Sequence, residues 1–368
     1  MIKNIFKSVL SGAIILALPG LTFGFVEFGE YNKTEFSPER KEKFEIPIKL
    51  TEAARVKIDL YTADGDLVRT IKSNKPLKEG VHKLRWDGKD DKGRLVPDEV
   101  YIPVLAASTE KGKKKTIDSR KTSGGEVVEN LQTQVTAGRN IAYTLPAPSR
   151  VLIRAGIKGG PMMRSLANWE PRSAGKNIQR WDGMDQSQVL NLRNEEKLTV
   201  LVMAYRFPEY AIITLGNQNI TYAEYRKKRG WLRRVVKPED MTLIRNDVRI
   251  ARQYYVSPAQ ARDPRVELSF AGIKNKKSNG LPLFRPGQSI QVKVNINKED
   301  RWLIDQNLYE VAFFVDHEFT SEEEQGYMPL TWLWTVNELS PGQHIFTVNI
   351  SGFDGKVGVV SQLFEVAK

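Results

Sequence analysis

The stretch Trp86-Asp87-Gly88-Lys89-Asp90 decides the fold, because its tripeptide Trp-Asp-Gly and its second aspartate recur at the same spacing in this chain of 368 residues. Its second copy, Trp181-Asp182-Gly183-Met184-Asp185, lies 95 residues later. The same offset relates further identical residues without a gap: Leu50 and Leu145, Arg55-Val56 and Arg150-Val151, Gly65 and Gly160, Arg69 and Arg164, and Gly80 and Gly175. Self-similarity at a fixed period indicates a repeated structural unit. The chain therefore contains at least two copies of one small domain.

Apolar and polar residues alternate on both sides of the first copy. This period of two predicts strands with one buried and one exposed face. Ala63-Asp64-Gly65 supplies a hairpin turn, because glycine adopts positive φ without steric cost. The expected strands of the first unit are residues 44–50, 55–61, 67–71, 84–86 and 100–106. Short strands separated by turns rich in Gly and Asp are typical of a small β-sandwich.

The same alternation returns twice later in the chain. The expected strands of the second unit include residues 141–145, 151–155 and 198–206. A third β-rich block contains expected strands at residues 266–270, 290–296, 346–350 and 364–366. The fold class is therefore predicted to be all-β, with three tandem Ig-like β-sandwiches and a basic linker.

Domain boundaries are placed where this alternation stops. The predicted organisation is a signal peptide at 1–24, an Ig-like domain at 25–110, a linker with one strand at 111–139, an Ig-like domain at 140–216, a basic linker or insert at 217–262 and an Ig-like domain at 263–368.

The N-terminus has the layout of a secretory signal peptide. Lys3 and Lys7 provide positive charge, residues 9–18 are a short apolar run, and Thr22-Phe23-Gly24 offers a cleavage site. The apolar run falls short of the ~20 residues that span a membrane. We therefore expect an exported protein, in the periplasm, at the outer surface or outside the cell. The chain has no cysteine, which excludes a lipoprotein, a disulfide scaffold and C-x-x-C-H haem attachment.

The chain carries a net charge of +12, which falls to +10 when the signal peptide and its two lysines are removed. An excess of this size favours an anionic neighbour, such as a phospholipid surface, an acidic polysaccharide or an acidic protein. Plain solubility is the alternative explanation. Nucleic acid is not expected as a partner of an exported protein, and no cofactor is expected.

A basic segment between the second and third units is the best candidate interaction surface. Residues 222–237 contain seven Lys and Arg side chains and one acid, Glu224. Aromatic rings among cations suit contact with anionic lipid at a membrane surface, or with an acidic partner protein. A solvated helix or linker is the alternative, and Gly230 interrupts any long amphipathic helix. The predicted partner-binding residues are Arg226, Lys227, Lys228, Arg229, Trp231, Arg233 and Arg234.

The turn that contains the repeated Trp-Asp-Gly suggests two kinds of binding site, a calcium site and a sugar platform, and the residues argue against both. Asp87, Asp90 and Asp91 invite a calcium site, but their spacing does not fit an EF-hand loop. Asx-type turns, in which each carboxylate accepts backbone N–H groups, explain them more simply. Trp86 and Trp181 could be platforms for sugar rings, but a large aromatic that closes a thin sandwich is the usual role. We therefore predict that both tryptophans are core residues.

The three histidines, His82, His317 and His344, are far apart in sequence. None has the spacing of a zinc helix or a nucleophile elbow beside it. A cation could be gathered by Asp316, His317, Glu318 and the run Glu322-Glu323-Glu324, but a solvated loop is the favoured interpretation. No metal site and no catalytic residue is predicted.

Residues 55–101 resemble the Ig-like domain of the flagellar hook-cap protein FlgD, a module that recurs in many exported bacterial proteins. The resemblance rests on Val56, Ile58, Tyr61, Asp64-Gly65, Leu67-Val68-Arg69, Gly80-Val81-His82, Leu84, Trp86-Asp87-Gly88, Asp90, Gly93, Pro97 and Tyr101. The second copy keeps Gly160, Arg164, Gly175 and Trp181-Asp182-Gly183 but lacks the later Gly and Pro. The last block resembles other bacterial Ig-like modules through Pro329, Thr331, Trp332, Trp334, Leu339, Gly342 and His344.

The resemblance implies a tandem of FlgD-like sandwiches followed by another Ig-like module. It implies a fold more than a function, because such modules are appended to proteins of many kinds. We expect an exported, non-enzymatic scaffold or adhesion and assembly protein that binds another protein or an envelope polymer. The alternative is a carbohydrate-active or other hydrolytic enzyme whose site lies between domains. A cluster of carboxylates, or a histidine near a carboxylate, in an inter-domain cleft would favour the enzyme. The oligomeric state stays open.

Overall fold

The computed structural model describes residues 24–73, 75–136, 140–217, 219–231, 243–245, 248–250, 262–273, 280–304, 308–324, 326–352 and 355–368. The predicted signal peptide lies outside these ranges except for Gly24, so its cleavage stays a prediction. No helix in the described part of the chain is both long and apolar enough to cross a membrane.

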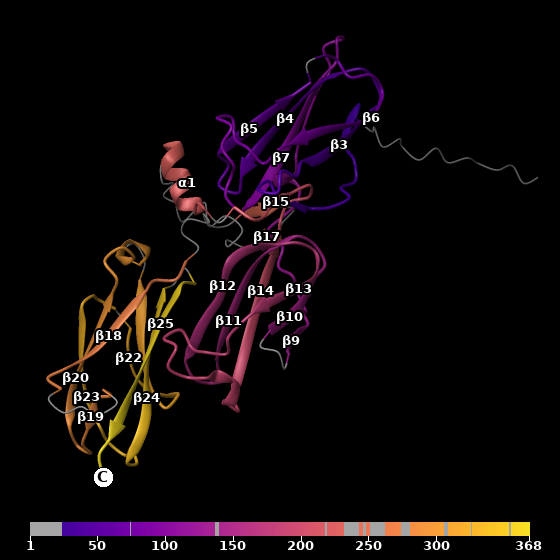
Figure 1. Ribbon diagram of the computed structural model, residues 1–368. Helices are drawn as coiled ribbons and strands as arrows, with labels where there is room; N and C mark the ends of the chain where they lie inside the picture. The colour runs from indigo at the N-terminus through magenta and orange to yellow at the C-terminus, as the bar shows by residue number, and fades with distance from the viewer. Residues whose placement is uncertain are drawn as a thin grey trace, which may run out of the picture.

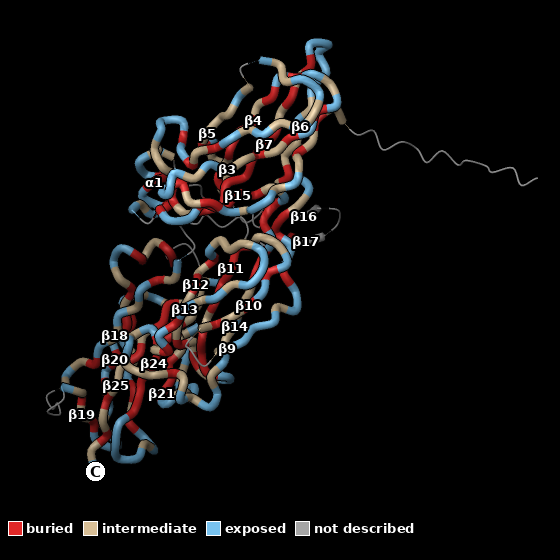
Figure 2. The backbone as a smooth tube through the Cα atoms, turned by 45° about the vertical axis from the view of Figure 1, so that its right-hand side comes forward, coloured by how far each residue is buried: buried red, intermediate tan, exposed pale blue. Residues whose placement is uncertain are grey.

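The predicted all-β class is confirmed. Three units, each built of two packed sheets, follow one another along the molecule (Figure 1). Each unit has its own buried cluster of apolar side chains. Figure 2 shows these buried residues along the strands and the exposed residues at the turns. The single α-helix of the described residues is α1 (Tyr222–Arg229).

The first unit packs a three-stranded sheet on a larger one. The smaller sheet has the order β1 (Val26–Phe28), β3 (Phe44–Leu50), β6 (Gly80–Trp86). The larger has the order β2 (Glu35–Phe36), β15 (Ile212–Thr214), β7 (Val100–Ser108), β4 (Arg55–Thr62), β5 (Leu67–Lys72), with β8 (Lys114–Asp118) also beside β7. The alternating residues predicted to face inward, such as Ile46, Ile48, Ile58 and Leu60, are fully buried between the sheets.

The first unit is completed by a segment far along the chain. β15 pairs antiparallel with β7, with Ile212 opposite Tyr101, and parallel with β2. Ile212 and Tyr225 belong to the buried cluster of the first unit. Burial of these apolar side chains explains why the chain returns, since Ile212 and Ile213 are fully buried there. The second unit is therefore inserted between β8 and β15 of the first.

This arrangement differs from the predicted linkers at both ends of the second unit. Residues 111–139, predicted to be a linker with one strand, contain β8, which joins the first unit, and β9 (Thr133–Val135), which joins the second. The short 3-10 helix Ser119–Lys121 follows β8. The basic segment after residue 216 begins with α1, which packs on the first unit.

The second unit again consists of two small sheets. One has the order β13 (Gly175–Arg180), β10 (Asn140–Leu145), β9, and the other the order β12 (Met162–Arg172), β11 (Ser149–Ile157), β14 (Leu198–Arg206). A 3-10 helix, Leu192–Asn194, precedes β14. A separate hairpin joins β16 (Leu243–Arg245) to β17 (Val248–Ile250).

The repeated tryptophan has the same role in both units. Trp86 and Trp181 are 1% and 5% exposed, which confirms that they are core residues. The indole Nε1 of Trp86 donates a hydrogen bond to the carbonyl of Lys89 at 2.9 Å. Trp181 donates to the carbonyl of Met184 at 3.0 Å. The polar edge of each ring is thereby satisfied inside the turn that follows it.

The repeated arginine also makes the same bond twice. Arg69 Nη1 donates to the carbonyl of Asp90 at 2.7 Å. Arg164 Nη1 donates to the carbonyl of Asp185 at 2.8 Å. Each hydrogen bond links the strand after the hairpin to the turn after the tryptophan. Residues that are 95 positions apart in the sequence therefore make equivalent interactions in the two units.

The third unit packs the sheet β18 (Val266–Ala271), β20 (Ser289–Ile296), β23 (Leu330–Thr335) on a five-stranded sheet. The latter has the order β19 (Leu283–Phe284), β25 (Val357–Val366), β24 (Gly342–Gly352), β21 (Tyr309–Val315), β22 (Glu318–Glu323). A 3-10 helix spans Arg301–Leu303. Aromatic rings fill the space between the sheets, including Phe270, Phe346 and Phe364.

A buried ion pair joins the first two units. Arg150 Nη2 lies 2.8 Å from Glu99 Oε1, and the two side chains are 1% and 4% exposed. Arg150 Nη1 donates to the carbonyl of Trp169 at 2.8 Å, and its guanidinium lies over the ring of Phe207. Burial raises the pKa of Glu99, and the charge of Arg150 opposes that shift. The Glu99 carboxylate also accepts a hydrogen bond from its neighbour's N–H.

Hydrogen bonds and apolar packing join the second unit to the third. Asn349 Nδ2 donates to the carbonyl of Met162 at 2.9 Å, and Met162 N donates to Asn349 Oδ1 at 2.8 Å. The backbone N–H of Ser361 donates to Ser187 Oγ at 2.7 Å. Ile345 of β24 is part of the buried cluster of the second unit. The faces of β24 and β25 are therefore shared between two units.

Removal of one partner from the buried pair is expected to destabilise the junction of the first two units. Arg150→Ala leaves the Glu99 carboxylate buried without its cation, which costs about 3–5 kcal/mol. Urea unfolding followed by tryptophan fluorescence measures the loss. The matched control is Arg85→Ala, which removes an exposed ion pair and should cost less than about 1 kcal/mol. Equal losses for the two variants would contradict a stabilising role for the buried pair.

The stability of the third unit should depend on the charge of His344. Its Nδ1 lies 2.6 Å from Asp316 Oδ2 and its Nε2 lies 2.7 Å from the carbonyl of Ser340. Two acceptors require two N–H groups, so the geometry fits the imidazolium. Burial by itself lowers the pKa of His344, but the bonds to Asp316 and Ser340 outweigh it and raise that pKa above its ordinary value.

A histidine whose pKa is raised on folding stabilises the protein fully below its unfolded pKa of about 6.5. That contribution is lost as pH rises through the folded value. We therefore expect the Tm of the third unit's transition to fall as the pH rises above about 6.5. Differential scanning calorimetry of His344→Gln should show a flatter pH profile, with His82→Gln as the control. A wild-type profile that rises over this range would refute the assignment.

Candidate binding surfaces

The predicted basic segment begins as the short helix α1. Thr221 and Glu224 form a capping box at its start, in which Thr221 Oγ1 accepts from the Glu224 N–H at 3.2 Å and Glu224 accepts from the Thr221 N–H at 2.9 Å. The helix ends at Gly230, which has φ of 71° and so adopts the left-handed conformation that favours glycine. The helix is therefore two turns long.

The first turn of α1 is held by two aspartates of the β4–β5 hairpin. Arg226 forms ion pairs with Asp64 and, at 3.0 Å, with Asp66. The hydroxyl of Tyr222 donates to Asp64 Oδ2 at 2.7 Å. The side chain of Arg226 is only 8% exposed. This arginine therefore faces the first unit and not the solvent.

The last turn of α1 contacts the turn that follows Trp86. Arg229 forms ion pairs with Asp90 and Asp91, and the hydroxyl of Tyr225 donates to Asp90 Oδ2 at 3.1 Å. Burial raises the pKa of the Tyr225 hydroxyl. Trp231 packs edge-on against Tyr225, with the guanidinium of Arg229 over its ring. Four carboxylates of the first unit are thus matched by two arginines of the helix.

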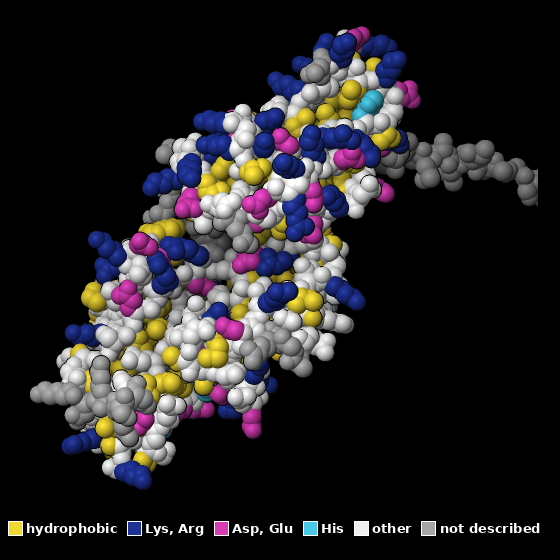
Figure 3. Space-filling model, in the orientation of Figure 1, with side chains coloured by type: hydrophobic (Ala, Val, Ile, Leu, Met, Phe, Trp, Pro, Cys, Tyr) yellow, Lys and Arg dark blue, Asp and Glu magenta, His cyan; other side chains and the backbone are white. Residues whose placement is uncertain are grey.

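The structure divides the predicted partner-binding residues. Arg226 and Arg229 are used within the molecule, and Trp231 is partly buried against the first unit. Lys227 and Lys228 are exposed. Arg233 and Arg234 lie outside the described residues. Figure 3 shows Lys and Arg side chains spread over the visible face of the molecule, so the basic segment is one of several cationic regions.

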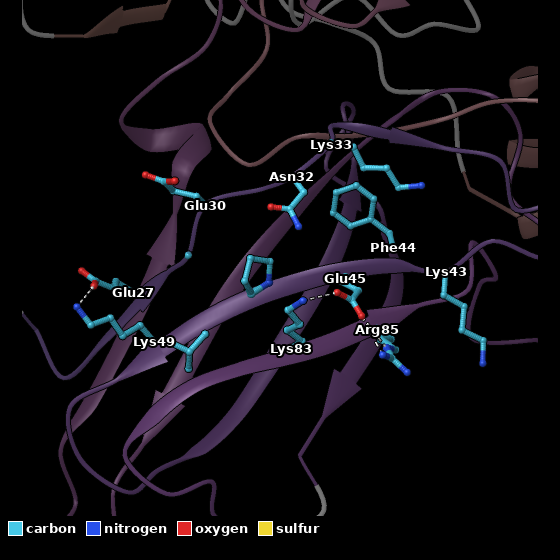
Figure 4. A pocket seen from close by; sticks show the side chains of 13 residues that line it. Glu27, Glu30, Asn32, Lys33, Lys43, Phe44, Glu45, Lys49, Lys83 and Arg85 are labelled. Carbon is cyan, nitrogen blue, oxygen red and sulfur yellow. Dashed lines mark hydrogen bonds and ion pairs between the residues drawn. The ribbon is translucent and has the colours of Figure 1, made fainter.

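A groove on the outer face of the first unit was not found by sequence reasoning. It has a volume of about 770 Å³. Figure 4 shows it along the outward residues of β3 and β6. The lining residues are Glu27, Gly29, Glu30, Asn32, Lys33, Lys43, Phe44, Glu45, Pro47, Lys49, Val81, Lys83 and Arg85. The available signal was the alternation itself, because the polar positions of residues 44–50 and of the Trp86 strand form this face.

Cations outnumber carboxylates in the groove. Lys83 and Arg85 each contact Glu45 at 2.8 Å, and Lys49 lies 3.4 Å from Glu27. The hydrogen bond from Lys83, followed by that from Arg85, lowers the pKa of Glu45. Because one carboxylate is shared by two cations, the face keeps an excess of positive charge. Such a face can bind an extended anionic chain or an acidic strand.

The aspartates of the repeated turn have structural roles. Asp87 Oδ1 accepts from the N–H of Lys89 at 3.1 Å. Asp90 Oδ1 accepts from the N–H groups of Lys92 and Arg94 at 2.9 and 3.0 Å. The predicted Asx-type turns are thus confirmed. Burial opposes ionisation of Asp90, but hydrogen bonds from Arg94 and Lys92 outweigh it and lower its pKa. The described residues contain no group of three or more His, Cys, Asp or Glu that could hold a metal ion.

The acidic stretch after Asp316 is a strand and not a solvated loop. Asp316 and His317 form a tight turn with positive φ, and residues 318–323 form β22, the edge of a sheet. Pairing with β21 explains the difference. His317 Nε2 lies 3.4 Å from Glu195 Oε2 of the second unit. A histidine thus lies beside a carboxylate between two units, which is one part of the arrangement that would favour the enzyme alternative.

The two repeats use the same corner for docking. In the first, the carbonyl of Leu67 accepts a hydrogen bond from Arg229 of α1. In the second, the equivalent carbonyl, that of Met162, accepts from Asn349 of the third unit. Each carbonyl begins the strand after the hairpin, β5 or β12. A helix and a whole domain therefore occupy equivalent positions on the two units.

Comparison with known proteins supports the identity of the first unit. Residues 34–111 match the family described as FlgD Ig-like domain. No curated protein matches the chain. Among solved structures, FlgD from P. aeruginosa is similar at 23% identity, over 26% of this chain and 71% of that one, with a TM-score of 0.22.

Two other structures resemble longer parts of the chain. The fibronectin(III)-like modules of CbhA from Clostridium thermocellum match at 10% identity over 93% of this chain and 94% of theirs, with a TM-score of 0.21. A tetra-tandem repeat from the extending region of a large adhesion protein matches at 11% identity over 92% and 73%, with a TM-score of 0.19. The chain contains one FlgD Ig-like domain, over residues 34–111.

Proposed function

We propose that this protein is an exported, non-enzymatic scaffold that holds three Ig-like units in a row and binds another protein or an envelope polymer. The observation that carries the proposal is the buried Glu99–Arg150 pair between the first two units. Domains joined only by linkers move relative to one another. A buried, hydrogen-bonded pair fixes their geometry instead, and fixed spacing is what a scaffold supplies.

The second unit is, in this proposal, a diverged copy of the FlgD-like module. The support is the set of equivalent hydrogen bonds made by Trp86 and Trp181 and by Arg69 and Arg164. Two copies of one module give a scaffold successive units of similar size. Export is inferred from the N-terminal sequence alone.

The partner is proposed to be anionic, whether an acidic protein or an envelope component. The groove of the first unit and the exposed Lys227 and Lys228 supply the cations. Complementary charge increases the association rate and selects the partner. Peripheral contact with an anionic membrane surface would use the same side chains.

Charge reversal on α1 should separate docking of the helix from partner binding. Arg226→Glu with Arg229→Glu places new carboxylates against buried aspartates, so it should cost about 3–5 kcal/mol of stability. Lys227→Glu with Lys228→Glu changes the same number of charges at exposed positions and should stay within about 0.5 kcal/mol. Urea unfolding measures both. If the lysine pair proved as damaging as the arginine pair, the proposed docking of α1 would be incorrect.

Site-specific photo-crosslinking in the native envelope tests the scaffold proposal. A photoreactive residue at Val81, which is 67% exposed in the groove, should give a discrete adduct. The control position is Ile178, which is 66% exposed on the equivalent strand of the second unit. Lys43→Glu with Lys83→Glu should reduce the adduct several-fold. A chain that gives no adduct from either unit, in its native envelope, is not a scaffold of the proposed kind.

One observation favours the second candidate function, a hydrolytic enzyme with a site between domains. It is the contact between His317 and Glu195 across the second and third units. A screen of envelope polysaccharides and peptides for turnover tests this candidate. Turnover that is lost in His317→Gln without a loss of stability would replace the scaffold proposal.

A further inference from the structure

Two edge strands at opposite ends of the row carry opposite charge. β6 is the edge of the smaller sheet in the first unit, and β22 is the edge of the five-stranded sheet in the third. Within the described residues, each pairs with a strand on one side only. The two units lie at the two ends of the molecule (Figure 1). An edge strand leaves backbone N–H and C=O groups that can pair with another strand.

β6 is a basic edge. The strand contains His82, Lys83 and Arg85 and no acid. Val81 is 67% exposed on the same outward face as the two long cations, as Figure 4 shows for Lys83 and Arg85. A strand laid beside β6 would thus meet free backbone groups, two long cations and one apolar side chain.

β22 is an acidic edge. Its six residues, Glu318–Glu323, include three glutamates and no base, and Glu324 follows directly. Phe319 is 56% exposed. Glu318 lies 3.7 Å from Lys197, but both side chains are largely exposed, so that pair is weak. On β6, Lys83 and Arg85 share the single carboxylate of Glu45, so the glutamates of β22 supply the negative charge that would balance that strand.

The whole chain shows the same separation of charge. Residues 263–368, which form the third unit, contain fourteen Asp and Glu and ten Lys and Arg. Residues 25–262 contain thirty acidic and forty-four basic side chains. The end that carries β22 is therefore acidic, and the remainder of the chain is basic. Long-range attraction would orient two copies with the third unit of one toward the first unit of the other.

The charges select one pairing out of three. Two β6 edges repel each other, and so do two β22 edges, because like charges on facing strands are destabilising. One β6 and one β22 attract. Charged edges normally prevent association between copies, but here they prevent only the symmetrical pairings. The permitted contact joins different surfaces of two copies, and such head-to-tail contacts build rings or open chains of copies.

We propose that β6 of one copy pairs with β22 of a second copy, so that the protein assembles head to tail through strand addition. The partner is the same chain, which goes beyond the proposed function, because a scaffold can act as a monomer. Main-chain hydrogen bonds supply affinity in such a contact. The glutamates of β22 and the cations of β6 supply specificity.

Sedimentation velocity of the full-length mature chain at low and high salt tests the proposal. We expect concentration-dependent oligomers at low salt that dissociate at high salt, since exposed charges are screened over about 8 Å at physiological ionic strength. Lys83→Glu with Arg85→Glu should weaken association at least tenfold, and Glu322→Lys with Glu323→Lys should do the same. The control is Lys176→Glu with Arg180→Glu, on the edge strand β13 of the second unit, which should leave association unchanged.

Mixing the two reversed variants gives the sharper result. One has two acidic edges and the other has two basic edges, so neither should assemble alone, whereas an equal mixture should form alternating oligomers. Thermal melts of each variant confirm that it folds. A chain that stays monomeric at low salt, or a mixture that stays monomeric while the wild type assembles, overturns the proposal. So does an equal effect of the β13 control.

Cysteine cross-linking locates the contact, because the native chain has no cysteine. Val81→Cys with Thr320→Cys in one chain should give a ladder of oligomers with a short bis-maleimide, and either change alone should give no species larger than a dimer. No ladder from the double variant would refute the strand pairing. Loss of the ladder leaves the photo-crosslink from Val81 to another envelope component unaffected, so the two proposals can fail separately.

Discussion

The buried ion pair between Glu99 and Arg150 is the constraint on which the arrangement of the units depends. Two charges removed from water are costly unless each meets its partner in good geometry. The pair meets that condition at 2.8 Å with further bonds to backbone groups. The first repeat has Arg55 at the equivalent position, where it is exposed. Burial of Arg150 therefore results from the contact between the units and not from the repeat itself, and any displacement of the units would leave two unmatched charges.

The sequence predicted the local structure well because local structure depends on neighbouring residues. Alternation located most strands, and the short Asp-Gly turns fixed the hairpins. The alternation could not predict that Ile212 and Tyr225 complete the core of the first unit, because their contacts are with residues more than a hundred positions earlier in the chain. From the sequence, the apolar run at residues 211–213 could equally be the end of the second unit or a strand of the first. In the structure it pairs with β7 and so belongs to the first unit.

The site was predicted only in part, for a related reason. The basic segment was treated as one surface because its charges are adjacent in sequence. A helix separates them, so that Arg226 and Arg229 face the first unit while Lys227 and Lys228 face solvent. The groove depends on the register of β3 and β6, in which Glu45 lies opposite Arg85. The register between two strands cannot be predicted from the sequence of either strand alone.

The corner at Leu67 and Met162 has a consequence for how such modules diversify. The constant element is a backbone carbonyl, which no substitution removes, and the side chains around it differ between the copies. Asp64 and Asp66 correspond to Gly159 and Pro161, so one corner holds a cationic helix and the other a neutral amide. A repeated module can therefore bind a different element at this corner when two or three hairpin residues are changed, while its core stays intact. Without the two arginines of α1, the hairpin and the turn after Trp86 would leave Asp64, Asp66 and Asp91 without these counter-charges, so the negative charge at this corner depends on the helix that covers it.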